Sequence, residues 1–105
     1  MGDRGCTEEL KITIIGNAEN HWQSPVRAGD TVQLRKDPNN AYDDEAIRVL
    51  DQSGNDIGWV ANSTRTVAQG TFSAGRVYDK IGNIARAKIV FKVHDGPALA
   101  RILGR

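Results

Sequence analysis

The chain has 105 residues, of which 39% are hydrophobic and 26% are charged, and its formal net charge is +1. This length is typical of one domain that buries a single core. No apolar run approaches the roughly 20 residues that a membrane span needs, and the first ten residues lack the apolar stretch of a secretory signal. Cys6 is the only cysteine, which excludes an internal disulfide and favours a cytoplasmic location.

The charges are unevenly distributed along the chain. Residues 37–56 contain six acids and one arginine, whereas residues 57–94 contain six bases and one aspartate. A basic half can form a phosphate-binding surface even in a nearly neutral chain, although such a pattern more often marks a solvated face. The candidate phosphate-contacting residues are Lys36, Arg76, Lys80, Arg86, Lys88 and Lys92.

Four segments have the short, alternating apolar pattern of strands before residue 61: residues 11–15, 30–36, 46–50 and 56–60. Between the first two lies a long loop that contains His21 and Trp22, and long loops in compact domains are often functional. Residues 51–56, DQSGND, have the Gly and Asx content of a hairpin turn. In the fourth segment, alternation predicts Ile57 and Trp59 on one side.

The second half is less regular until residue 85. Residues 62–82 begin with good N-cap residues and contain several glycines, which predicts short helical turns around a loop. Residues 85–94 form the clearest strand, with Ala85, Ile89, Phe91 and Val93 on one side. Pro97 predicts a brief C-terminal helix over PALARIL.

These elements predict a mainly β protein, a small antiparallel β-barrel with short helical insertions. We expect a flexible N-terminus over residues 1–9 and one domain over residues 10–105. The predicted core includes Ile47, Val49, Ile89 and Phe91.

Signatures of catalysis are absent from the sequence. The two histidines, His21 and His94, have no Cys or Glu at metal-ligand spacing. The chain has neither a G-x-S-x-G motif nor a phosphate-binding glycine loop followed by lysine. We therefore expect no metal, no cofactor and no enzyme activity.

The stretch LRKDPNNAYDDEAIRVLDQSGNDIGWVANS resembles the signature of the HIRAN domain, in which a polar N-x-Y-D loop precedes two strands. The match spans about thirty residues and includes Asp37, Pro38, Asn40, Tyr42, Asp43, Ala46, Ile47, Val49 and Gly58. The chain departs from the pattern at Ala41, where proline is usual, and in its extra acids Asp44 and Glu45. The segment that follows is similar to small standalone bacterial HIRAN proteins.

The resemblance implies an OB-like barrel that binds single-stranded DNA at an exposed 3′ end, in DNA repair or replication, with a helicase or nuclease as a candidate protein partner. Its motif residues carry over to Asn40, Tyr42 and Asp43, and Trp59 follows the glycine of the motif. An ionised Asp43 can accept the proton of a terminal hydroxyl. Tyr42, Trp59, Trp22 and His21 offer flat faces on which bases stack.

Other interpretations of these residues remain open. Asn40 and Asp43 are also typical of an Asx turn that binds backbone amides, and Trp59 could belong to the core. The same loop surface could hold a protein partner instead of DNA. DNA binding would weaken steeply with ionic strength, which separates the two functions.

Overall fold

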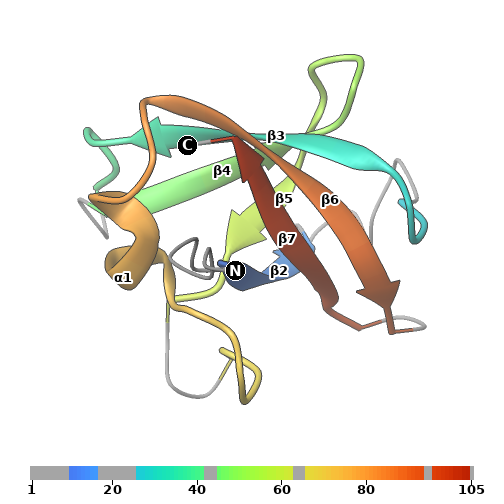
Figure 1. Ribbon diagram of the computed structural model, residues 1–105. Coiled ribbons are helices and arrows are strands. Elements are labelled where there is room, and N and C mark those ends of the chain that lie inside the picture. Colours follow the sequence, from blue (N-terminus) through green and yellow to red (C-terminus); the bar gives the residue numbers. More distant parts are fainter. Residues whose placement is uncertain (1–9, 17–25, 42–44, 63–65, 94–95, 105) are drawn as a thin grey trace, which may run out of the picture.

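The computed structural model describes residues 10–16, 26–41, 45–62, 66–93 and 96–104. In these residues, six antiparallel strands close into a barrel in the order β2-β5-β4-β3-β6-β7 (Figure 1). The strands are β2 (Lys11–Gly16), β3 (Thr31–Asp37), β4 (Ala46–Leu50), β5 (Asp56–Val60), β6 (Ile84–Lys92) and β7 (Ala98–Gly104). One short helix, α1 (Ala74–Tyr78), lies between β5 and β6 in the sequence.

The predicted strands are confirmed, and the barrel has one strand where the sequence indicated a helix. The prediction of a C-terminal helix from Pro97 is wrong, because residues 98–104 form β7 and pair with both β2 and β6. Ala98, Ala100 and Ile102 point inward and are buried, so the segment has the period of two that a strand needs. Pairing on both sides satisfies the backbone and overrides the helix preference of Ala and Leu.

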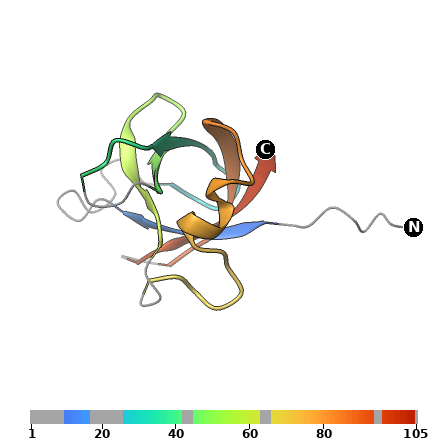
Figure 2. The ribbon, with the colours of Figure 1, turned by 90° about the vertical axis from the view of Figure 1, so that its left-hand side faces the viewer.

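The core fills the inside of the barrel and continues under α1. Ile47, Val49 and Ile89 are buried there as predicted. Ala74 and Val77 of α1 are buried in the same cluster, and the helix lies across one end of the barrel (Figure 2). The Nζ atom of Lys36 donates a hydrogen bond of 2.8 Å to the carbonyl of Ile81 at this end.

The helix begins later than the N-cap residues at 62–64 indicated. Its N-cap is Ser73, whose hydroxyl oxygen accepts from the amide of Arg76 at 3.3 Å. Asn62, which lies 13 residues earlier in the sequence, also caps the helix: its Oδ1 accepts a hydrogen bond of 2.8 Å from the amide of Gly75. Two of the free amides at the start of α1 are thereby satisfied.

Register shifts of the β-bulge kind change which side chains face the core. The register of β6 against β7 shifts between Ile89 and Phe91, and Phe91 is 55% exposed. The prediction that Phe91 belongs to the core is therefore wrong. A second shift pairs Leu50 with Asp56 and Val49 with Gly58. An extra residue in a bulge breaks simple alternation.

The second bulge also corrects the prediction for β5. Ile57 is 2% exposed and belongs to the core, whereas Trp59 is only partly buried. Trp59 pairs across the strands with Arg48, whose neighbours Ile47 and Val49 point inward. Trp59 therefore lies on the outer face of the barrel, not on the side of Ile57.

Candidate nucleic-acid interface

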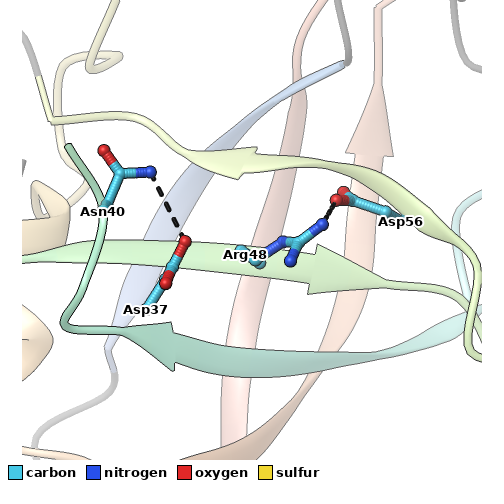
Figure 3. A network of polar contacts seen from close by, with 4 residues as sticks. All are labelled: Asp37, Asn40, Arg48 and Asp56. Carbon is cyan, nitrogen blue, oxygen red and sulfur yellow. Dashed lines mark hydrogen bonds and ion pairs between the residues drawn. The ribbon is translucent and has the colours of Figure 1, made fainter. Parts of the chain in front are cut away.

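The polar loop that carries the sequence motif connects β3 to β4. At its start, the amide of Asn40 donates to the carbonyl of Asp37 at 3.1 Å. The side-chain Nδ2 of Asn40 also points back to the carboxylate of Asp37, with a long hydrogen bond of 3.4 Å (Figure 3). Asn40 thus helps to close the turn that follows β3.

The end of this loop lies next to the start of α1. A Cβ atom placed on Gly75 would lie 2.8 Å from Oε1 of Glu45 and 3.2 Å from Oδ1 of Asn62. Glycine at this position therefore leaves room for both side chains. The motif loop, Asn62 shortly after β5, and α1 consequently meet at one end of the barrel, on the left of Figure 1.

An arginine and a tryptophan lie together on the outer face beside this loop. The Arg48 guanidinium lies over the Trp59 ring, 5.6 Å from its centroid. Asp56 forms an ion pair with the Nη2 atom of the same arginine (Figure 3). A cation held over an aromatic face is stabilising, so Asp56 and Arg48 together restrict the orientation of the Trp59 ring.

Trp59 and Arg48 belong to a row of cross-strand neighbours on the outer face. Ile15 pairs with Trp59, Trp59 with Arg48, and Arg48 with Arg35. Arg35 is exposed, and the motif loop leaves β3 only two residues after it. The row therefore combines an aromatic ring with two arginines at the edge of the polar loop.

The predicted phosphate-contacting residues separate into three groups. Arg86 and Lys88 are exposed on the outer face of β6. Arg76 and Lys80 are exposed on α1 and just after it; Arg76 lies 5.0 Å from the centroid of the Phe72 ring. Lys36 and Lys92 each donate to a backbone carbonyl, of Ile81 and Val93, at 2.8 and 2.6 Å.

Other sequence-predicted site residues fall outside the described part of the chain. These are His21, Trp22, Tyr42 and Asp43. Of the predicted 3′-end residues, the structure therefore places Asn40 and Trp59. Both lie in or next to the β3–β4–β5 part of the barrel.

Arg35 and Arg48 were not singled out from the sequence, whereas the structure places them in one row with Trp59 in the candidate interface. Both lie at the polar positions of alternating strands, flanked by buried residues such as Leu34 and Val49. That alternation places them on the outer face. Only the strand register shows that they are direct neighbours of each other and that Arg48 neighbours Trp59.

A shallow concavity of about 340 Å³ lies between α1 and the segment before it. It is lined by Asn62, Ser73, Arg76 and residues 67–71, so it opens close to the end of the motif loop. Within the described residues, no group of His, Cys, Asp and Glu is arranged to hold a metal ion. None of the helices described there is long and apolar enough to cross a membrane.

Comparisons with known proteins agree with this geometry. The model of the HIRAN domain matches residues 7–93. Among solved structures, the HIRAN domain of human HLTF is similar with a TM-score of 0.58 at 22% sequence identity, over 92% of this chain and 76% of that chain. No curated protein matches the chain. The family match covers most of the sequence and the closed barrel has the OB-like HIRAN fold; the chain belongs to the HIRAN domain family.

Proposed function

We propose that this protein is a non-enzymatic module that binds single-stranded DNA at an exposed 3′ end, in DNA repair or replication. The observation that carries the proposal is the outer-face row of Arg35, Arg48 and Trp59 at the edge of the motif loop. Bases stack on aromatic rings for about 1–3 kcal/mol each, and arginines bind phosphate through several donors. The row offers both kinds of contact.

The end of the strand would be recognised by the motif loop. A terminal 3′-hydroxyl is a donor, and an ionised carboxylate is an acceptor-only group. We assign the acceptor role to Asp43 and a stacking role to Tyr42, on the resemblance of the motif. Asn40 lies at the start of this loop, where it can fix the turn or contact a base edge. His21 and Trp22 are further stacking candidates.

The phosphates would be bound by the cations around this row. Arg86 and Lys88 on β6, and Arg76 and Lys80 near α1, expose their charges. Lys36 and Lys92 each donate to a backbone carbonyl. Because a lysine ammonium has three donors, that bond alone does not prevent contact with a phosphate.

The test compares short single strands that end in a 3′-hydroxyl, in a 3′-phosphate or in a hairpin that blocks the 3′ end, by fluorescence anisotropy. We expect the hydroxyl end to bind about tenfold to a hundredfold more tightly, because a charge-assisted hydrogen bond contributes about 1.5–3 kcal/mol. The phosphate end brings negative charge toward Asp43, Asp44 and Glu45. Equal affinity for the three ends would reject end capture.

Two variants separate the roles within the loop. Asp43→Asn keeps the shape but removes the charge, so it should reduce the preference for hydroxyl over phosphate. Tyr42→Ala should weaken binding to every strand by the loss of stacking and leave that preference unchanged. A Tyr42→Ala variant that binds as tightly as the wild type would remove this residue from the site.

A protein-interaction module is the second candidate, and one observation favours it. Val90, Phe91 and Val93 are 52%, 55% and 41% exposed at the end of β6. Exposed apolar groups of this kind mark interaction surfaces, and a helicase or nuclease would be a fitting partner. Binding that changes little with ionic strength would favour this function, since DNA binding falls steeply with salt.

A further inference from the structure

We propose that Arg35, Arg86 and Lys88 form a basic track over β3 and β6 that holds the DNA strand on the 5′ side of the captured nucleotide. This inference rests on the proposed function and adds the path and polarity of the bound strand. The track is defined by these three residues, which are all exposed.

The strand register makes the three side chains neighbours. On β3, Thr31, Gln33 and Arg35 point outward between the buried Val32 and Leu34. Their partners on β6 are Lys88, Arg86 and Ile84 in that order. Arg35 is therefore diagonal to Arg86, at about 7–8 Å between backbones, and Lys88 follows two residues further along β6.

Within the described residues, no acidic side chain forms an ion pair with the three cations of the track. Asp56 of β5 is paired with Arg48 instead. The nearest described contact of Arg35 is a hydrogen bond of 3.4 Å to Gln33. Three cations are thus available to an anionic ligand.

Like charges also lie directly opposite each other at both ends of the track. Arg35 pairs with Arg48, and Lys88 pairs with Arg101. Directly opposed like charges destabilise a sheet. Local rules of this kind are broken most often at functional sites. A bound polyanion would reduce the repulsion, which Asp56 already offsets in part at Arg48.

The position of the track determines the direction of the strand. Arg35 neighbours Arg48, which lies over Trp59, and the motif loop leaves β3 after Asp37. If the terminal nucleotide is held at the loop and Trp59, the rest of the strand lies on its 5′ side. The adjacent cations on β3 and β6 are the next anion-binding groups along this face, and Gln33 and Thr31 add neutral donors between them.

The test measures how affinity depends on strand length. Oligothymidylates with a 3′-hydroxyl and from about two to about ten nucleotides are titrated against the wild type and variants at several salt concentrations. We expect wild-type affinity to rise with length. Arg86→Ala and Lys88→Ala should each weaken the longest strands roughly three- to tenfold, lower their salt slope by about 0.7, and leave the shortest strand almost unchanged. Arg35→Ala should weaken strands of every length, because Arg35 also belongs to the row beside the motif loop.

The matched control is Lys11→Ala. Lys11 is an exposed cation on β2, which neighbours neither β3 nor β6 in the closed barrel. It lies across β7 from the Lys88 end of the track, because both residues pair with Arg101. This variant removes the same charge as Arg86→Ala but should keep the length dependence. Arg35→Lys should retain most of the binding, and unfolding midpoints close to that of the wild type will show that each variant is folded.

The outcomes separate the track from the proposed function. If the wild type prefers a 3′-hydroxyl but affinity does not rise with length, or if Arg86→Ala and Lys11→Ala behave alike, the track is wrong while end capture stands. If length dependence and the effect of Arg86→Ala persist without a preference for the 3′-hydroxyl, end capture is wrong. Failure of the wild type to bind any strand overturns both and leaves an acidic protein as the partner of this face.

Discussion

At the scale of single residues, Gly58 determines how closely β2 and β5 approach beside the candidate site. A Cβ atom on Gly58 would lie 2.1 Å from the backbone oxygen of Ile15 and 3.1 Å from the Cα of Gly16. Both contacts are to backbone, which cannot move away as the end of a long side chain can. The close approach that a glycine within a strand suggests is therefore confirmed, and it positions the neighbouring Trp59.

Gly58→Ala should destabilise the protein by about 3 kcal/mol, because the two strands must separate to admit a methyl group. Urea unfolding followed by tryptophan fluorescence measures the change. Gly82→Ala is the matched control, since its new Cβ would approach only the Ile84 oxygen at 3.8 Å. That variant should be neutral or slightly more stable. Equal stability of the two variants would contradict the close approach.

At the scale of elements, the bulges decide which side of a strand reaches the core. In β6, Ile89 is 1% exposed and Phe91 is 55% exposed, although they are two residues apart. Without the register shift between them, both would point the same way. A single inserted residue therefore converts a core position into an exposed aromatic beside the outer basic face.

This arrangement predicts very different losses of stability for two truncations in one strand. Ile89→Ala should cost about 2–5 kcal/mol, because it leaves a cavity in a packed core. Phe91→Ala should change the free energy of unfolding by less than about 0.5 kcal/mol, as an exposed position does. Chemical denaturation of both variants measures these values, and a loss for Phe91→Ala as large as that for Ile89→Ala would show that β6 has no bulge.

At the scale of the whole molecule, β7 completes the barrel. It pairs with β6 on one side and with β2 on the other, and it buries Ala98, Ala100 and Ile102. Without it, β2 and β6 would become open edges, and unpaired edges promote association. The fold of the candidate interface on β3, β4 and β5 thus depends on β7.

Deletion of residues 98–105 should abolish the cooperative thermal transition and produce soluble aggregates, because the core loses one wall. Circular dichroism during heating and size-exclusion chromatography measure the two effects. Removing only residues 104–105 is the control. This shorter deletion should leave a sharp transition, because it removes only the pairing of Gly104 with Arg86 from the barrel. A cooperative, monomeric 98–105 deletion would contradict the role of β7.

The sequence by itself determined the family, the β class and most strand limits. The motif around Asn40 and Gly58 is contiguous, and β3 and most of β6 alternate in a way that local sterics dictate. The same information indicated that Arg86 and Lys88 face solvent. These features depend on residues close together in the chain, so a linear pattern is sufficient to predict them.

Only the tertiary structure decided the rest. The C-terminal segment became a strand because β2 and β6 offered partners on both sides, and the bulges moved Phe91 and Trp59 to the outer face. The meeting of Arg35, Arg48 and Trp59 likewise follows from the register between three strands. Register and closure are set by pairing between distant segments and by the packing of one shared core, and no local pattern contains that information.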